Sequence, residues 1–346
     1  MTVEGMAVKG IDAADVNAEG ADVVVLGSLN MDLVAQVSRL PRPGETILGK
    51  NFSTVPGGKG ANQAVAAVRL GAQTAMIGRV GNDSFGQMLR DELVADKIDV
   101  SAVGKSDRAP SGTALIAVAP QNNQIVVVPG ANSEVGETAL DDLKRHMQTA
   151  TVLLLQFEVP IPVVQSAAAL ARKAGLLVIV DPAPARGPLP DQFCRDISIL
   201  TPNQTEAELL TGVKVTDIES AFVAARLLQK QGVQTVIVKL GELGSVCVMA
   251  EGSFAVPAFS VEAIDTIAAG DAFNGGLAAA LCRSNLSRFN LSRARQHQSD
   301  DGDCSLSAMK SAVVYASAVS AIAVTRSGAQ PAMPTQADVD AFLAMQ

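Results

Sequence analysis

The sequence predicts an α/β fold in which helices cover both faces of a mostly parallel central sheet. Short apolar runs that suit strands buried on both faces alternate with helix-like segments, and this alternation is typical of a parallel sheet. The expected strands cover residues 22–27, 75–78, 152–156, 176–181, 197–201 and 236–239. The expected helices cover residues 61–70, 86–96, 163–174 and 218–231.

Two other regions alternate apolar and polar residues, which indicates half-exposed antiparallel strands. They comprise residues 33–38 with 45–53, and residues 113–119 with 125–129. Residues 121–124 are expected to form a hairpin turn. We therefore expect a small second sheet attached to the main body. Its apolar face would need a cover, which a substrate, a second subunit or both would supply.

The domain organisation expected from the sequence is one large domain at 21–346 after a flexible extension at 1–20. A polar segment at 283–305 separates two Ala-rich helix candidates, 272–282 and 306–323, and is interpreted as a surface insertion. The first 20 residues show no signal-peptide pattern, and we expect no membrane span later in the chain. A cytoplasmic location is therefore expected, with organelle targeting left open.

Charge and side-chain chemistry exclude several classes of function. The formal net charge of -8 argues against a nucleic-acid partner, which would need a basic face. The spacing of the four cysteines disfavours a zinc site, and free thiols are typical of a reducing compartment. Neither His146 nor His297 lies in a recognisable catalytic context, which disfavours a Ser-His-Asp mechanism. The cysteines are Cys194, Cys247, Cys282 and Cys304.

A run of small residues, Ala268, Ala269 and Gly270, precedes Asp271 and an Ala-rich segment expected to be helical. Free amides at a helix start bind anions, so this run suits a phosphoryl group. Asp271 in the same turn is placed to accept a proton from an attacking hydroxyl. Considered alone, a Gly-Asp pair at a helix start is more often a helix cap, which is the alternative for Asp271.

A second polar cluster follows the first strand. Asn30 and Asp32 alternate, so their side chains could point the same way and bind neighbouring hydroxyls, although an Asx turn is an alternative. The glycine-rich run at 57–63 contains Gly58, Lys59 and Asn62 but lacks the spacing of a P-loop. Glu158 ends another expected strand and could add a sugar contact.

Residues 30–32, 57–63 and 265–271 together resemble the PfkB family of carbohydrate and nucleoside kinases, and residues 57–63 resemble the ribokinase branch within it. The resemblance runs from about residue 21 to the end of the chain. It implies a three-layer αβα sandwich of ribokinase-like fold, with the small sheet as a lid that often pairs between two subunits. A homodimer through this lid is therefore expected.

The resemblance also implies roles for individual residues. Asp271 becomes the catalytic base, and Ala268, Ala269 and Gly270 form the anion hole. The implied ribose site comprises Asn30, Asp32, Gly58, Lys59, Asn62, Glu158 and Asp271. The implied ATP site comprises Asn203, Lys239, Leu240, Gly241, Glu242, Leu243, Gly244, Gly270, Asp271 and Ser317.

Two cation sites are implied by the same resemblance. Glu206, in an Asn-x-x-Glu motif, would organise Mg²⁺ through water. A K⁺ site of mostly backbone carbonyls would comprise Asp265, Ile267, Ala323, Arg326 and Gly328. For Asp265, a simple turn residue is the alternative.

Three residues depart from the family pattern. Ser317 stands where a larger residue often flanks the adenine, and Ala332 replaces a hydroxyl near the cation loop. Asp181 begins an Asp-Pro-Ala-Pro run where the family pattern has Asn.

The activity implied is transfer of phosphate from MgATP to the 5-hydroxyl of D-ribose, with activation by K⁺. Deoxyribose, fructose or adenosine remain alternative substrates, and a non-catalytic sugar-binding protein is the alternative of another class. Phe52 is the only ring in the predicted lid, which favours a free sugar over a nucleoside.

Overall fold

The computed structural model describes residues 20–120, 122–283 and 301–346. Its main sheet has nine strands in the order β13-β12-β11-β10-β9-β8-β1-β4-β5, and among these β12 alone runs opposite to the others. The strands are β1 (Val23–Leu26), β4 (Thr74–Gly81), β5 (Val103–Ser106), β8 (Val152–Gln156), β9 (Leu177–Asp181), β10 (Ile199–Leu200), β11 (Thr235–Lys239), β12 (Ser245–Met249) and β13 (Gly252–Val256).

The strands of this sheet are apolar on both faces because each face packs against helices. In β1, Val23 and Val25 belong to one hydrophobic core, whereas Val24 and Leu26 belong to the other. Successive strand side chains point to opposite faces, so a continuous apolar run feeds two cores at once. The α/β prediction is therefore confirmed.

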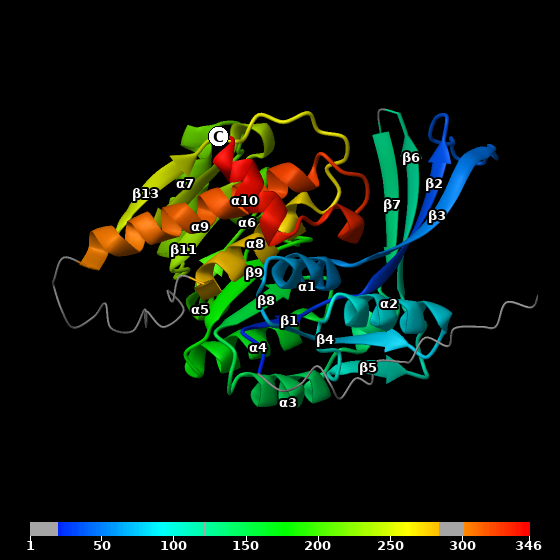
Figure 1. Cartoon of the computed structure of the whole chain (residues 1–346), viewed down its shortest axis with the longest axis horizontal. Coiled ribbons are helices and arrows are strands. Elements are labelled where there is room, and N and C mark those ends of the chain that lie inside the picture. Colours follow the sequence, from blue (N-terminus) through cyan, green and yellow to red (C-terminus); the bar gives the residue numbers. More distant parts are fainter. Residues whose placement is uncertain (1–19, 121, 284–300) are drawn as a thin grey trace, which may run out of the picture.

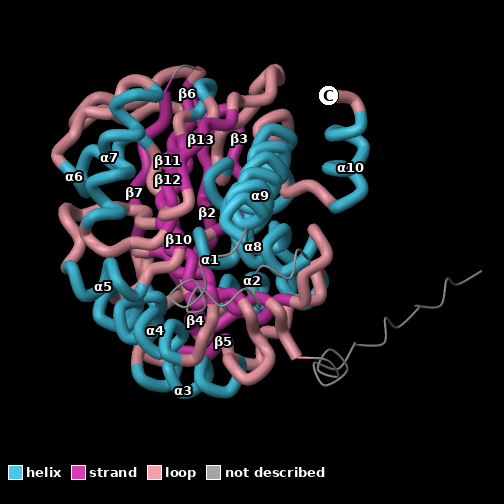
Figure 2. The backbone as a smooth tube through the Cα atoms, turned by 90° about the vertical axis from the view of Figure 1, so that its left-hand side faces the viewer, coloured by secondary structure: helices cyan, strands magenta, loops and turns pink. Residues whose placement is uncertain are grey.

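Figure 2 shows the sheet between its two layers of helices. The core on one face includes residues of α1 (Lys59–Arg69), α2 (Ser84–Ala95), α8 (Ala269–Arg283), α9 (Asp301–Ala323) and α10 (Gln336–Ala344). The core on the other face includes residues of α3 (Glu137–His146), α4 (Ile161–Lys173), α5 (Asp191–Asp196), α6 (Gln204–Thr211) and α7 (Ile218–Lys230). Short 3-10 helices are η1 (Gly130–Glu134), η2 (Gly241–Leu243) and η5 (Gln330–Ala332).

A separate four-stranded sheet projects from the body beside α1 and α2 (Figure 1). We call it the lid sheet. Its order is β3-β2-β6-β7, with β2 parallel to β6 and the other pairs antiparallel. Its strands are β2 (Asn30–Val37), β3 (Gly49–Gly57), β6 (Gly112–Ala119) and β7 (Asn122–Val128). The predicted small second sheet is therefore confirmed.

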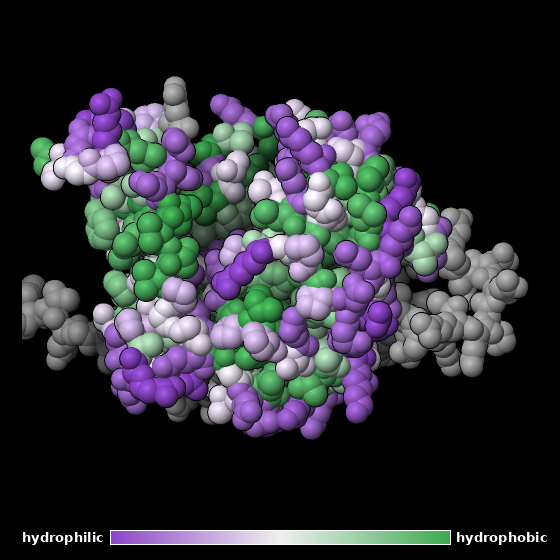
Figure 3. Space-filling model, turned by 180° about the vertical axis from the view of Figure 1, so that it is seen from behind, coloured by the Kyte–Doolittle hydropathy of each residue, from purple (hydrophilic) through white to green (hydrophobic). Residues whose placement is uncertain are grey.

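Apolar side chains of the lid sheet gather on the surface in Figure 3, at the left, beside a hollow against the main body. Every residue of β7 is exposed, and Val126 remains 55% exposed. Because β-branched residues alternate to both faces of β7, neither face of this strand is covered in the single chain.

Some predicted boundaries were wrong. Asn30 and Asp32 lie in strand β2 rather than in a loop, which excludes the Asx-turn alternative. Residues 122–124 belong to β7, not to a hairpin turn, and residues 45–48 precede β3. The antiparallel edge strands β12 and β13 were not predicted.

The predicted insertion at 283–305 begins with Arg283, the last residue of α8, and overlaps the start of α9 at its other end. Residues 284–300, like residues 1–19 of the predicted extension, lie outside the described residues. One described helix segment, Leu306–Ala323, is long and apolar enough to cross a membrane by length and composition only. It is part of α9, which packs along α8.

Candidate active site

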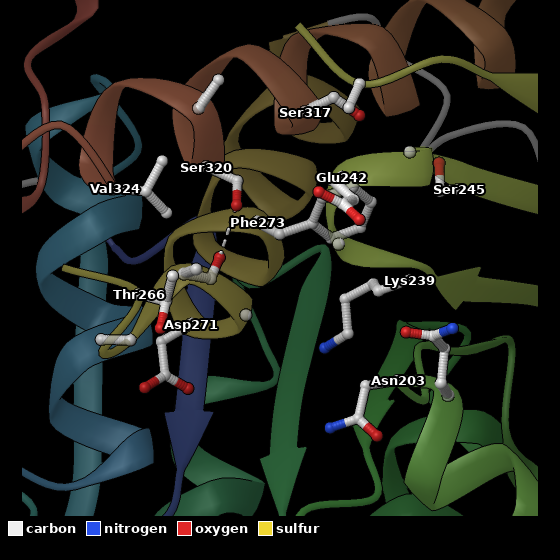
Figure 4. Close-up of a pocket in the computed structure, with 18 of the residues that line it drawn as sticks. Asn203, Lys239, Glu242, Ser245, Thr266, Asp271, Phe273, Ser317, Ser320 and Val324 are labelled. Atoms are coloured by element: carbon white, nitrogen blue, oxygen red, sulfur yellow. Dashed lines mark hydrogen bonds between the residues drawn. The ribbon is translucent and has the colours of Figure 1, made fainter. Parts of the chain in front are cut away.

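A cavity of about 800 Å³ opens at the carboxyl ends of β9, β10 and β11, beneath α9. Open α/β sheets bind ligands at this edge because the loops that follow parallel strands converge there. Figure 4 shows Lys239 and Asn203 across the cavity from Asp271, with Ser317 and Ser320 of α9, and Val324 directly after this helix, along the upper wall. The cavity is lined by Lys59, Asn203, Glu206, Lys239, Gly241, Glu242, Gly244 and residues 268–271, among others.

The start of α8 brings backbone amides to this cavity. Ala268 has a left-handed φ of 58°, and its carbonyl accepts the first helical hydrogen bond, from Ala272 N at 2.8 Å. A Cβ placed on Gly270 would lie 3.2 Å from Lys239 Nζ, so the lysine amine sits close to the helix start. The helix dipole and this cation together favour an anion here.

Asp271, in the first turn of α8, is 3% exposed. One carboxylate oxygen accepts from Asn62 Nδ2 at 3.0 Å, and the other accepts from Gln63 Nε2 at 3.0 Å. Both donors lie on α1, so the carboxylate is turned toward α1 and its bonds are not those of a helix cap. Burial raises the pKa of Asp271 above its usual value, and the charge of Lys59 opposes this rise.

The residues predicted to bind sugar meet on the lid side of Asp271. Glu158 Oε2 accepts from Ser28 Oγ at 2.6 Å, Lys59 N at 3.2 Å and Asn30 Nδ2 at 3.5 Å. Asn30 and Asp32 are two residues apart on β2, so their side chains share one face. A cluster of acceptors and amide donors of this kind suits the hydroxyls of a sugar.

The protonation state of Asp32 depends on its burial and on the neighbouring carboxylates. Burial raises the pKa of Asp32 to about 7, and the nearby carboxylates of Glu158 and Asp271 add to the rise. Lys59 shows the opposite response. Burial acts to lower the pKa of Lys59, but the carboxylates of Asp271, Asp181, Glu158 and Glu206 outweigh burial and raise it. The positive charge of Lys59 therefore lies among carboxylates of both the sugar cluster and the large cavity.

Glycines are needed where α1 meets β2. Gly58 has a φ of 90°, and a Cβ there would lie 2.7 Å from the backbone nitrogen of Asn30. A Cβ on Gly57 would lie 2.5 Å from Asp32 Oδ2. A side chain at either position would push the sugar-side residues apart.

On the nucleotide side, Asn203 caps α6 and forms a capping box with Glu206. Burial raises the pKa of Glu206, and the charge of Asp181 adds to this effect. The loop after β11 contributes Gly241, Glu242 and Gly244 to the cavity wall. Two predicted ATP residues do not line the cavity, since Leu240 packs in the hydrophobic core and Leu243 is exposed on the surface.

Ser317 lines the cavity and donates to Val313 O within its own helix at 2.8 Å. Two aromatic residues that sequence reasoning missed, Phe259 and Phe273, also line it. Neither belongs to a motif, and only the fold brings them to this wall.

The predicted K⁺ residues lie on two loops that Asp265 ties together. Its carboxylate accepts from Ile267 N at 2.9 Å and from Gly328 N at 3.0 Å. Val324 O at the end of α9 accepts from Asp265 N at 3.1 Å, and Ala323 O accepts from Arg326 N at 3.1 Å. Asp265 therefore has specific partners beyond its own turn.

Other buried polar residues at the site were also missed. Asn132 of η1 accepts from Leu29 N at 2.9 Å and donates to Asn30 Oδ1 at 2.8 Å. Gln63, which the glycine-rich run contains, and Gln156 at the end of β8 are fully buried beside Asp271. Asp181, noted only as a departure from a pattern, lies in the same polar cluster. Gln63 was recoverable from its motif, whereas Asn132 carried no signal in the sequence.

The comparisons with known proteins agree with this geometry. A sequence model described as pfkB family carbohydrate kinase matches residues 21–336. The chain belongs to this family. The family match and the sugar-kinase relatives described next define the chain as an ATP-dependent sugar kinase.

Three relatives illustrate the match. The Ribokinase of Haemophilus influenzae is 38% identical over 322 residues, covering 93% of this chain and 98% of that protein. The Deoxyribokinase of Salmonella typhi is 33% identical over 325 residues, covering 94% and 99%. The structure of Arabidopsis thaliana Ribokinase complexed with ribose and ATP matches with a TM-score of 0.80 at 30% identity, covering 94% and 99%. The ribokinase-like fold class and the family resemblance are therefore confirmed.

Proposed function

We propose that this sugar kinase transfers the γ-phosphate of ATP to the 5-hydroxyl of D-ribose, with Asp271 as the base. The observation that carries the proposal is the position of Asp271. Its buried carboxylate lies where the predicted sugar residues on β2 and α1 meet the start of α8 at the large cavity. The ribose and ATP bound to the Arabidopsis relative support these two ligands.

In this mechanism Asn30, Asp32 and Glu158 hold the sugar hydroxyls, and Asp271 accepts the proton of the 5-hydroxyl. The sugar oxygen forms a bond to the γ-phosphorus while the bond to the bridging oxygen breaks, and ADP leaves. Amides at 268–271 and the Lys59 and Lys239 ammonium groups stabilise the charge on the transferred group. The raised pKa of Asp271 makes it a stronger proton acceptor.

Mg²⁺ fits the nucleotide side. Glu206 lines the cavity, and one of its carboxylate oxygens accepts from Asn203 N at 2.8 Å. Among the described residues no group of three or more His, Cys, Asp or Glu side chains converges on a metal position. Mg²⁺ would therefore rely on nucleotide oxygens and water for most of its ligands, with Glu206 acting through water. Bound in this way, the ion would neutralise phosphate charge.

A monovalent cation such as K⁺ fits beside Asp265. The C-terminus of α9 presents backbone carbonyls there, and the negative end of the helix dipole adds to the charge of Asp265. The residues that would hold the ion are Asp265, Ile267, Ala323, Arg326 and Gly328. The cation would fix the loop at 265–267, which leads directly into the anion hole.

The lid sheet supports a homodimer. Ile125, Val126, Val127 and Val128 are each at least 44% exposed, and a second copy of the sheet would cover one face while sugar covers the other. Sedimentation measurements on wild type and on Val126→Asp would show a dimer that the charge dissociates. A wild-type monomer at all concentrations would contradict this arrangement.

Substrate identity is tested by an ATP-consumption panel over ribose, deoxyribose, fructose and adenosine. Ribose should give the highest kcat/KM. Deoxyribose is the main competing substrate, because the Deoxyribokinase relative is 33% identical over nearly the whole chain. A higher kcat/KM for deoxyribose or adenosine would overturn the proposed specificity, and sugar binding without ATP consumption would indicate a non-catalytic protein.

A further inference from the structure

Asp181 is a buried carboxylate at the end of β9 to which the mechanism above gives no role. A charge in this position needs partners, and Asp181 has two of different kinds. Oδ1 accepts from Lys239 Nζ at 3.1 Å, and Oδ2 accepts from Gln63 Nε2 at 3.0 Å. One oxygen thus faces the nucleotide cavity, and the other faces the residues around Asp271.

Gln63 joins the two carboxylates. Its single amide nitrogen donates to Asp181 Oδ2 and to Asp271 Oδ1, both at 3.0 Å, which uses both of its protons. Gln156 Nε2 donates to Gln63 Oε1 at 2.7 Å and so fixes which way the amide points. A reversed amide would place its oxygen against two carboxylates. Three hydrogen bonds, to Asp181, to Asp271 and from Gln156, therefore fix the orientation of the Gln63 amide.

The other end of this chain of contacts reaches the phosphate position. Lys239 Nζ, bonded to Asp181, lies near Gly270 at the start of α8. A lysine side chain is intrinsically flexible, because its ammonium group is carried at the end of four methylene carbons. The bond to Asp181 holds its ammonium group at the anion-binding amides. Lys239, Asp181, Gln63 and Asp271 therefore form one continuous chain from nucleotide to base.

We propose that Asp181 is a positioning residue that orients the Asp271 carboxylate through Gln63 and couples it to Lys239 at the nucleotide cavity. The proposal rests on the proposed function, since it assumes that Asp271 is the base. It assigns Asp181 no contact with sugar or phosphate. Its effect arises because a proton acceptor must be held in a narrow range of positions toward the attacking hydroxyl.

The charged groups around Asp271 determine in which direction each substitution should shift its pKa. Lys59 on α1 lowers the pKa of Asp271, and Asp181 on β9 raises it. Asp32 on β2 also faces the group, since the charge of Asp271 raises the pKa of Asp32. The hydrogen bond from Gln63 lowers the pKa of Asp271. Removing Asp181 or Gln63 should therefore move the acid limb of the kcat profile in opposite directions.

The first test is Asp181→Asn. The amide has one oxygen, so either Lys239 or Gln63 loses its acceptor. We expect kcat to fall on the order of 10-fold to 100-fold and KM for ATP to rise. The acid limb of kcat should move to lower pH, because loss of the neighbouring negative charge favours the ionised form of Asp271.

Gln63→Met is the second variant, because it keeps the size of the side chain and leaves the Asp181–Lys239 pair in place. Its kcat should also fall, but the acid limb should move to higher pH. Thr201→Val is the matched control. Thr201 is fully buried and donates to Asn274 on α8 at 2.8 Å, so its loss removes a buried hydrogen bond without touching Asp271. Its limb should coincide with that of wild type.

Wild-type kcat and an unshifted limb in Asp181→Asn would overturn the proposal. Equal losses in Asp181→Asn and Thr201→Val, without any shift of the limb, would also overturn it, because packing alone would explain them. Asp271→Asn separates the two hypotheses. If it is inactive while Asp181→Asn behaves as wild type, only the positioning role is wrong. If Asp271→Asn stays active, the base assignment is wrong and the positioning role fails with it.

Discussion

The sugar side and the nucleotide side of the site are built differently. On the sugar side, Asn30 and Asp32 lie on a strand, and buried side chains such as Asn132 hold their neighbours in place. On the nucleotide side, the wall consists of glycine-containing loops and helix starts around a wide cavity, and Asn203 is exposed. In the proposed mechanism, specific side chains would therefore select the sugar, whereas backbone amides and two lysines would bind the phosphates.

This difference predicts how substitutions divide between the two substrates. Changes on the β2 side should act on sugar KM, and changes in the loops should act on ATP KM. Asp271 lies between them, so its substitution should affect kcat with little change in either KM.

The largest effect is expected for Asp271→Asn. The amide keeps the shape of the side chain but cannot take up the proton, so kcat should fall by about 100-fold to 10,000-fold or more. Sugar affinity, measured by calorimetry, should stay within a few-fold of wild type because Asn30, Asp32 and Glu158 remain. A variant that keeps most of its kcat would show that Asp271 is not the base.

A smaller effect is expected for Asn132→Asp. Asn132 Nδ2 donates to Asn30 Oδ1, and this bond leaves Asn30 Nδ2 to face the sugar site. The substitution replaces that donor by an acceptor and should cost roughly 1–3 kcal/mol, or about 5-fold to 150-fold in sugar KM. KM for ATP should not change. A rise of both KM values together would contradict the separation of the two sides, and Thr201→Val provides the control for loss of a buried hydrogen bond.

The sequence predicted most of the fold because its strongest signals are local. The short apolar run at 152–155 is typical of a strand buried on both faces, and the structure has β8 at Val152–Gln156. Asn30 and Asp32 were correctly paired by spacing but placed in a loop, because pairing with β3 and β6 depends on residues far along the chain.

The buried polar contacts were the least predictable part. Gln156, Asp181 and Asn132 reach the site from separate elements, and no spacing in the sequence links them. The strand predicted at 197–201 was too long, since β10 covers only Ile199–Leu200. The residues on either side, Ser198 and Thr201, still form side-chain hydrogen bonds to the backbone of β9.

A third prediction concerns the monovalent cation. Kinase activity in buffer with only Na⁺ should fall well below that in K⁺, because the weakly hydrated ion suits a site of carbonyls and one carboxylate. Asp265→Asn should remove most of this difference while leaving KM for sugar nearly unchanged, since the loop at 265–267 leads to the anion hole. Identical rates in the two salts would remove the proposed cation site.

The smallest expected effect is the pH dependence of sugar binding without nucleotide. Burial raises the pKa of Asp32 to about 7, and an ionised carboxylate accepts more and stronger hydrogen bonds from sugar hydroxyls than a protonated one. The pKa is raised, so Asp32 becomes protonated, and loses acceptor capacity, as pH falls through about 7. Sugar affinity should therefore drop about fourfold between pH 8 and pH 6.5.

Calorimetry without ATP isolates this effect from the pH dependence of kcat that Asp271 produces. Asp32→Asn, which does not titrate, should bind sugar more weakly at pH 8 and show no change between the two pH values. If the dependence persists in this variant, another group on the sugar side titrates in its place. A flat wild-type profile would show that the protonation state of Asp32 does not control sugar binding over this pH range.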